Sequence, residues 1–154
     1  MTEIIARGVL AIDEWVLLCH SAGAANTFLP GGHIEFNESA TGALVREMKE
    51  ETGLAVAPAR FLGAMEHTFV QEGVQHCEVN LIFEMASEGL DPRVAPASHE
   101  GNISFRWVRM DGLSEARLEP KPLQRLLPLW IAGSGDATAW ASTYAADLSI
   151  EGGG

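Results

Sequence analysis

The stretch Gly31–Leu54 reads GGHIEFNESATGALVREMKEETGL. Ser39 is a good helix N-cap, because its hydroxyl can accept a hydrogen bond from a free amide of the first turn. Gly53 suits the left-handed position that follows a last helical turn. The pattern therefore predicts a helix over Ser39–Thr52, preceded by a loop over the Gly- and Pro-containing residues Asn26–Asn37.

The two faces of this predicted helix differ in chemistry. One face is apolar and is expected to pack on a sheet; it consists of Ala40, Ala43, Leu44 and Met48. The other carries Glu47, Glu50 and Glu51, whose spacing of three or four residues places them together. These charges repel each other, and near a helix C-terminus they also oppose the helix dipole. A divalent cation would reverse this balance, because Mg²⁺ prefers hard oxygen ligands and leaves positions open for water and phosphate.

A solvated acidic face is the alternative interpretation of the three glutamates alone. The wider pattern argues against it. Gly32, five residues, Glu38, seven residues and then REMKEETGL at Arg46–Leu54 match the signature of the Nudix hydrolases at every fixed position. The sequence thus resembles that family over this motif, and its strand pattern is similar across approximately Ile4–Ile131.

The resemblance implies an α/β (α+β) fold, the Nudix-type α/β/α sandwich, with a mixed β-sheet and helices on both faces. It also implies Mg²⁺-dependent, or alternatively Mn²⁺-dependent, hydrolysis of a phosphoanhydride bond in a nucleoside diphosphate linked to another group, by attack of water on phosphorus. The motif match assigns metal binding to Glu47, Glu50, Glu51 and the backbone carbonyl of Gly31. By the same match, Arg46 would orient the carboxylates and Glu38 would brace the loop before the helix.

A general base must take the proton from the attacking water, and three glutamates are candidates. Glu47 lies in the motif. Glu100 lies on the loop before the strand around Trp107, where several relatives place a catalytic acid. Glu78 lies in a predicted strand. For Glu100 and Glu78, an ordinary exposed carboxylate is the competing interpretation.

Histidine and aromatic residues provide candidate substrate contacts. Four histidines lack ligand spacing to one another, which favours surface or substrate-contact roles over metal binding. They are His33, His67, His76 and His99. Three aromatic residues suit stacking on a base, and suit a hydrophobic core equally well. They are Phe28, Phe69 and Trp107.

The rest of the chain predicts a sheet with helices packed on it. Two hairpins are expected, the first from Ile4–Ile12 and Trp15–His20 and the second from Arg60–Val70 and Val74–Ala86. They are followed by a loop at Glu88–Glu100, a strand at Ser104–Arg109 and a helix at Lys121–Ile131 with a kink or break at Pro128. We expect one domain over residues 1–132 and a flexible or loosely docked C-terminal tail, frayed or helical, over residues 133–154.

Charge and composition narrow the class of protein. The 154 residues include 21 Asp and Glu against 10 Lys and Arg, a net charge of −11, which argues against a protein that coats nucleic acid. A metal ion would still allow an acidic site to bind a small phosphorylated ligand. No signal peptide or run of 18 apolar residues is present, so we expect no membrane segment and a cytoplasmic location. Cys19 and Cys77 are expected to be buried free thiols rather than a disulfide.

The sequence restricts the choice of substrate only by lacking the additional motifs of particular subfamilies. No segment resembles those of the ADP-ribose, diadenosine-polyphosphate, NADH or coenzyme A types, so a nucleoside triphosphate or a nucleotide sugar remains open. A non-catalytic nucleotide-binding sensor of Nudix fold is the alternative function, and an isomerase of prenyl diphosphates ranks last because the cysteines do not fit it. A homodimer is possible, since Leu126, Leu129 and Trp130 suit an exposed apolar patch as well as a core.

Overall fold

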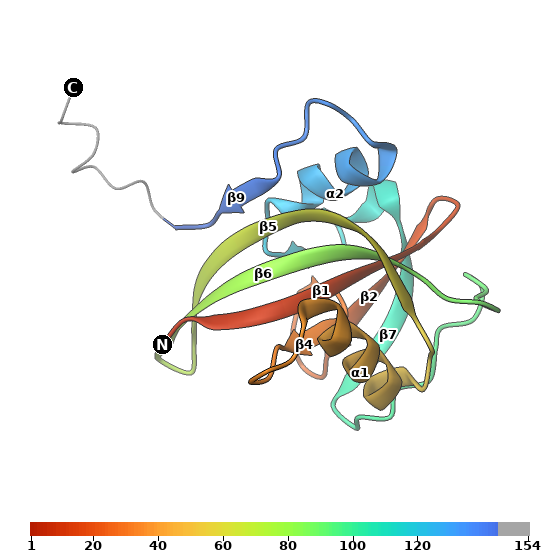
Figure 1. The fold of residues 1–154 in the computed structure, drawn as a ribbon, viewed down its shortest axis with the longest axis horizontal. Helices are drawn as coiled ribbons and strands as arrows, with labels where there is room; N and C mark the ends of the chain where they lie inside the picture. The colour runs from red at the N-terminus through yellow and green to blue at the C-terminus, as the bar shows by residue number, and fades with distance from the viewer. Residues whose placement is uncertain (145–154) are drawn as a thin grey trace.

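The computed structural model describes residues 1–144, which form a curled nine-stranded sheet with two α-helices (Figure 1). The strands are β1 (Glu3–Ile12), β2 (Trp15–Ser21), β3 (Thr27–Phe28), β4 (Gly31–His33), β5 (Ala57–Gln71), β6 (Val74–Ala86), β7 (Ile103–Arg109), β8 (Leu118–Glu119) and β9 (Trp140–Ser142). The helices are α1 (Ala40–Thr52), α2 (Leu123–Ala132) and the short 3-10 helix η1 (Met110–Gly112). None of these helices is long and apolar enough to cross a membrane.

Strand β1 is the centre of the sheet. It pairs in parallel with β6 along its length, for example Ile5 with Asn80. On its other edge it pairs antiparallel with β4 at the start, Arg7 facing Gly31, and with β2 at the end. The order along the main path is β8-β3-β2-β1-β6-β5-β9, with β7 pairing β2. The sheet is therefore mixed, as predicted.

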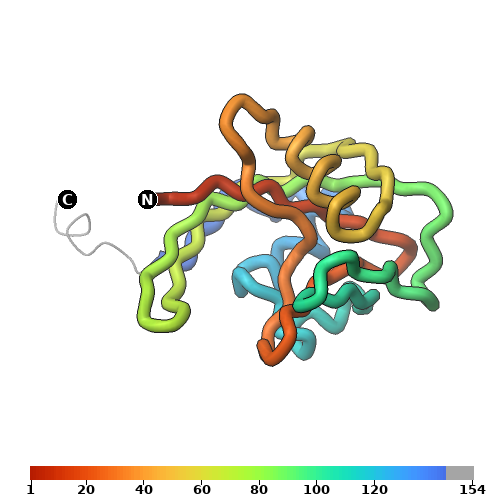
Figure 2. The backbone as a smooth tube through the Cα atoms, turned by 90° about the horizontal axis from the view of Figure 1, so that it is seen from below, coloured from red at the N-terminus to blue at the C-terminus, as the bar shows by residue number. Residues whose placement is uncertain are grey.

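Two hydrophobic cores lie on opposite faces of this sheet, because successive side chains of a strand point to opposite sides. The core under α1 contains Ala6, Leu10, Leu17, Cys19, Ala43, Leu44 and Met48. The core under α2 contains Val9, Val16, Leu18, Met65, Ile82, Leu126 and Trp130. Figure 2 shows the two helices on opposite sides of the strands. The predicted sandwich with helices on both faces is confirmed.

Both predicted caps of α1 are present. The Ser39 hydroxyl accepts a hydrogen bond from the Gly42 amide at 3.0 Å, and Gly53 has a φ of 75° with its amide donating to the Lys49 carbonyl at 2.9 Å. Helix α2 continues through Pro128 without the predicted break. Leu126 and Trp130 of this helix are buried, so they belong to the core rather than to an exposed patch.

Several short strands were not predicted. The expected loop Asn26–Asn37 contains β3 and β4, and β8 lies in a stretch without a predicted element. Strands of two or three residues are too short to show alternation of polar and apolar side chains, which is the signal used for strands. Strand β5 also begins at Ala57, ahead of the predicted Arg60. Cys19 is a buried free thiol, as predicted. Cys77 is also a free thiol, but it is half-buried and not buried as predicted.

Part of the expected C-terminal tail contains regular structure. Strand β9 extends the sheet by pairing in parallel with β5, Met65 facing Ala141. The Trp130 indole donates a hydrogen bond to the Thr138 carbonyl at 2.9 Å, which joins this segment to α2. Residues 140–142 are thus a strand and not a helix. Residues 145–154 of the predicted tail lie outside the described residues, and the domain boundary at 132 stays a prediction.

Candidate active site

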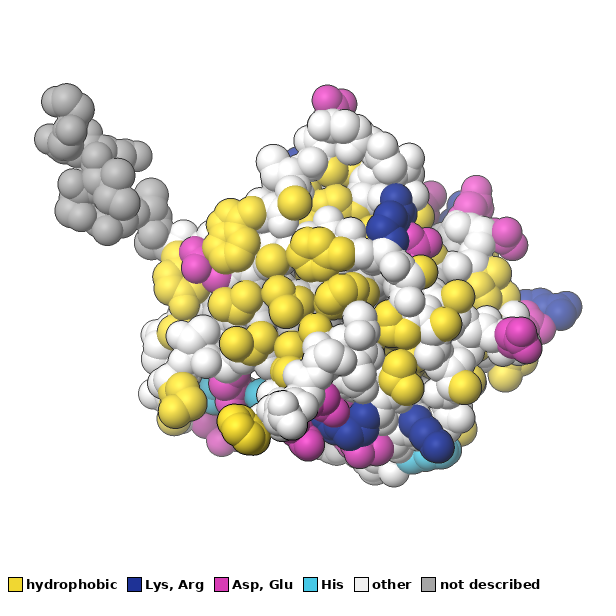
Figure 3. Space-filling model, viewed as in Figure 1, with side chains coloured by type: hydrophobic (Ala, Val, Ile, Leu, Met, Phe, Trp, Pro, Cys, Tyr) yellow, Lys and Arg dark blue, Asp and Glu magenta, His cyan; other side chains and the backbone are white. Residues whose placement is uncertain are grey.

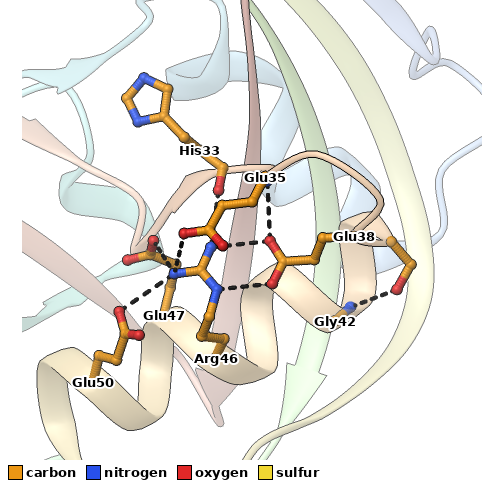
Figure 4. Close-up of polar contacts among 8 residues, drawn as sticks. His33, Glu35, Glu38, Gly42, Arg46, Glu47 and Glu50 are labelled. Carbon is orange, nitrogen blue, oxygen red and sulfur yellow. Dashed lines mark hydrogen bonds and ion pairs between the residues drawn. The ribbon is translucent and has the colours of Figure 1, made fainter.

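Arg46 connects the start of the motif to its end (Figure 4). Its Nε and Nη2 atoms donate to the two carboxylate oxygens of Glu38 at 2.8 and 3.0 Å. Its Nη1 donates to Glu47 at 2.9 Å and to Glu50 at 3.3 Å, and its Nη2 also donates to the His33 carbonyl at 3.1 Å. One guanidinium therefore fixes the β4–α1 loop against the acidic face of the helix.

The fork of Arg46 matches the two oxygens of a carboxylate, which makes the pair with Glu38 directional as well as charged. The hydrogen bond from Arg46, assisted by the Glu35 amide, lowers the pKa of Glu38 to about 2. Glu38 therefore remains ionised and paired at every pH near neutrality. Its position is that of a brace between the loop and the helix.

Glycines in β4 allow the helix to approach the sheet. A Cβ atom on Gly32 would lie 2.5 to 2.8 Å from the carboxylate atoms of Glu47. A Cβ on Gly31 would lie 2.0 Å from the Ala6 carbonyl oxygen, and Gly31 also has a φ of 142°, which favours glycine. The Glu47 carboxylate thus lies directly over the backbone of β4, next to the predicted carbonyl ligand.

Glu51 is the buried member of the acidic face, with 6% of its surface exposed. Burial and then the charge of Glu47, with which its side chain forms a hydrogen bond, raise the pKa of Glu51 to about 8. The charge of Glu100 adds to this effect. The loop that carries Glu100 is attached to the helix end, because the His99 amide donates to the Glu51 carbonyl at 2.7 Å. The structure therefore brings Glu100 into the neighbourhood of Glu47 and Glu51.

The chemistry of this donor set fits a hard divalent cation. Glu47, Glu50 and Glu51 offer only oxygen atoms, and the proton that Glu51 retains is the one a cation would displace. In residues 1–144, no three His, Cys, Asp or Glu side chains already surround one point as metal ligands. In this arrangement Glu47 and Glu50 share the Nη1 atom of Arg46, which is where their negative charge is balanced.

A cavity of about 650 Å³ lies at the sheet, lined by strands that are distant in sequence. It has the volume of a small-ligand pocket. Its lining includes aromatic, acidic and basic side chains: Arg7, Phe28, His67, Phe69, Glu78 and Glu119. Such a combination offers stacking surfaces together with hydrogen-bond acceptors and a cation.

Arg7 lines this cavity and is held in place by two hydrogen bonds. Its Nη1 donates to the Leu29 carbonyl at 3.1 Å, and its Nε donates to Asn80 at 3.3 Å. Asn80 is 1% exposed and in turn donates to Glu78 at 3.2 Å. The charge of Arg7 acts to lower the pKa of both Glu51 and His67, so it lies within electrostatic reach of both groups.

The predicted site residues lie in two regions, the acidic face of α1 and the cavity. Glu78 is 8% exposed and lines the cavity together with Phe28, His67 and Phe69, whereas the motif glutamates are not among its lining residues. Trp107 does not line this cavity; its indole donates to the Val94 carbonyl at 3.1 Å. Among the other histidines, His33 contacts Glu3 at 3.2 Å and His76 stacks on Phe69.

Sequence reasoning missed Arg7, Asn80 and Glu119. A signal for the first two was present in the strands. Arg7 shares a strand face with the buried residues Ile5 and Val9, and Asn80 shares one with buried Ile82, so each is a polar residue at an inward position of an apolar strand. Such positions are expected to be satisfied by partners or to face a ligand.

The sequence model of the family described as "NUDIX domain" matches residues 3–129 of the chain. The chain belongs to the Nudix family. Nudix hydrolases are pyrophosphohydrolases and generally use divalent metal ions, and the protein is placed in this enzyme class.

Solved structures share the Nudix fold with this chain. The solution structure of the E. coli ORF135 protein has a TM-score of 0.65 at 21% identity, over 88% of this chain and 95% of that chain. The MutT protein from Methanosarcina mazei Go1 has a TM-score of 0.66 at 19% identity, over 86% and 94%. A structure described as UDP-X diphosphatase has a TM-score of 0.59 at 22% identity, over 92% and 67%. At these identities the similarity supports the fold.

Proposed function

We propose that this Nudix protein hydrolyses a phosphoanhydride bond in a nucleoside triphosphate or a nucleotide sugar with Mg²⁺, or alternatively Mn²⁺, as its cofactor. The observation that carries the proposal is the motif geometry: Arg46 holds Glu47 and Glu50 on one helix face together with buried Glu51. Arg7, whose charge acts on Glu51, lines a separate polar cavity. The cavity would bind the nucleoside, and the carboxylates would act on the phosphates through the cation.

Glu47, Glu50 and Glu51, with the carbonyl of Gly31, would hold the metal ion. When bound, such an ion supplies neutralisation of the phosphate oxygens and a more acidic water. Arg46 would hold Glu47 and Glu50 on one side of the helix through its Nη1 contacts. Glu51 would give up its proton on metal binding, because its raised pKa arises from burial and from the neighbouring carboxylates.

The proton of the attacking water would pass to Glu47 or Glu100. Both lie near Glu51, whose pKa each of them raises. Glu78 is a weaker candidate for this role, since its carboxylate faces the cavity and accepts a hydrogen bond from Asn80. Glu78 and Glu119 would instead accept hydrogen bonds from the nucleobase of the substrate. This arrangement favours nucleobases with an amino group, which offers two N–H donors to the carboxylates, over uracil, whose ring offers only the N3–H donor.

The decisive experiment is a panel of nucleoside triphosphates and nucleotide sugars, UDP-sugars included, assayed with Mg²⁺ and with Mn²⁺. Wild type is compared with the Glu50→Gln and Glu51→Gln variants. Glu115→Gln, a change at an exposed carboxylate outside the site, is the matched control. We expect turnover of at least one compound by wild type and by the control, and a loss of about a hundredfold or more in both motif variants. Full activity in both motif variants, or no turnover by wild type, would refute the proposal.

A non-catalytic nucleotide sensor is the second candidate. Calorimetry that shows tight nucleotide binding without product formation would favour it.

The cytoplasmic location and the homodimer remain predictions. Hydrophobic side chains gather over β5 and β9 on the face shown in Figure 3, and Phe61 and Trp140 of these strands are each 51% exposed, which supports a contact surface there.

A further inference from the structure

His67 lines the cavity, and two contacts hold its ring in place. Its ring stacks on Phe69 with centroids 5.0 Å apart, and Phe69 stacks in turn on His76 at 5.0 Å. Its Nδ1 atom lies 2.8 Å from the hydroxyl oxygen of Thr143, the residue that follows β9. Stacking sets the plane of the imidazole and the Thr143 contact sets its rotation, so the remaining nitrogen, Nε2, has a defined direction.

Thr143 is itself anchored to β5. Its amide donates to the Glu66 carbonyl at 3.1 Å, and its hydroxyl oxygen accepts from the Thr68 amide at 3.0 Å. If His67 donated to the same oxygen, the hydroxyl would accept twice and have no protein acceptor in residues 1–144 for its own proton. Donation from the hydroxyl to Nδ1 satisfies both groups. The proton of the neutral imidazole then lies on Nε2.

Nε2 is available to a ligand. In the described part of the chain, every side-chain nitrogen and oxygen that is fully buried has a hydrogen-bond partner. The Nε2 atom of His67 has no partner among these residues. Nε2 is therefore not fully buried and can be reached from the solvent. Burial lowers the pKa of His67, and the charge of Arg7 acts in the same direction, while Glu78 and Glu119 oppose this shift. The imidazole is therefore neutral near pH 7 and has a single N–H to offer among carboxylates that only accept.

We propose that Thr143 is a positioning residue that holds His67 in its Nε2–H tautomer, so that the cavity presents one N–H donor to a carbonyl oxygen or ring nitrogen of a bound nucleotide. This inference rests on the proposed function for the identity of the ligand. It gives the segment around β9 a role in binding, although the segment lies beyond the residues that match the Nudix domain.

The first test is the tautomer of His67 in the metal-free wild type, measured by ¹⁵N NMR at about pH 8, where a histidine is neutral. We expect the proton on Nε2. In Thr143→Val, which removes the hydroxyl, we expect a mixture of tautomers, and in Thr143→Ser we expect the wild-type tautomer. A wild-type proton on Nδ1 overturns the proposal without any further variant, and so does an unchanged tautomer in Thr143→Val.

The second test is binding of GMP, CMP, AMP and UMP, followed by chemical shift without metal. We expect at least one of them to shift the His67 signals, and Thr143→Val to weaken its binding about three- to tenfold, the value of one hydrogen bond. Thr143→Ser should restore it, and Ser142→Ala, a hydroxyl of β9 that does not contact His67, should leave it unchanged. Absence of a His67 shift, or a change below about twofold in Thr143→Val, contradicts the proposal. Because these probes need no turnover, they separate this inference from the hydrolytic activity.

Discussion

Arg46 and Glu38 are joined by two parallel hydrogen bonds of 2.8 and 3.0 Å across the loop between β4 and α1. The same guanidinium contacts Glu47 and Glu50, so a change in its position would move these proposed metal-binding carboxylates as well. Lysine keeps the charge of arginine but lacks the planar fork that makes this double contact.

Arg46→Lys is therefore expected to lower kcat/KM by about ten- to a hundredfold, in the range found for residues that orient metal ligands. It should also weaken metal binding, which calorimetry with Mn²⁺ measures directly. Arg125→Lys, at an exposed position on α2, is the control and should behave as wild type. Unchanged metal affinity in Arg46→Lys would show that Arg46 does not orient the carboxylates.

Glu51 predicts how the stability of the metal-free protein depends on pH. Its pKa is raised from 4.5 to about 8, so the folded state binds this proton more tightly than the unfolded state. The resulting stabilisation is complete below pH 4.5 and is lost as the pH rises through about 8. We expect the Tm of the metal-free wild type to fall across this window, and the fall to be smaller in Glu51→Gln. Equal slopes in the two proteins would contradict the raised pKa.

Removal of divalent ions is expected to abolish turnover while the fold persists. The cores beneath α1 and α2 are apolar and contain none of the proposed metal ligands. EDTA should leave the far-UV circular dichroism unchanged, and Mg²⁺ at a hundred times its Kd should add about 2.7 kcal/mol to the free energy of unfolding. Global unfolding on chelation would mean that the metal is structural.

The two glycines of β4 are expected to respond differently to a methyl group. In Gly31→Ala, the new Cβ would lie 2.0 Å from the Ala6 carbonyl oxygen, and the backbone conformation there favours glycine. The free energy of unfolding should therefore fall by about 1–3 kcal/mol. In Gly32→Ala, the Cβ would meet the movable Glu47 carboxylate, so the fold should survive while metal affinity decreases. Thermal unfolding and Mn²⁺ calorimetry on both variants test this difference. Similar losses of stability in the two would contradict it.

The parts of the molecule that sequence predicted are those set by local chemistry. Ser39 and Gly53 determine the ends of α1 through contacts within a few residues, and the spacing of Glu47, Glu50 and Glu51 determines a shared helix face. The cavity could not be predicted in this way. Arg7 and Asn80 meet because β1 pairs in parallel with β6, and Glu119 joins them from β8, so its lining depends on contacts between distant strands. The caps are local, whereas this register is a property of the whole sheet.

The parallel pairing of β1 with β6 has a consequence for folding. Residues 3–10 of β1 find their partners only at residues 78–85, so a long intervening segment must be closed into a loop before these hydrogen bonds form. Contacts of such separation slow folding, and during synthesis they cannot form until β6 has left the ribosome. Helix α1 and the β5–β6 hairpin are able to form earlier from neighbouring residues. The helix that carries the motif glutamates and the strands that line the cavity therefore reach their final arrangement at a late step, when β1 joins β6.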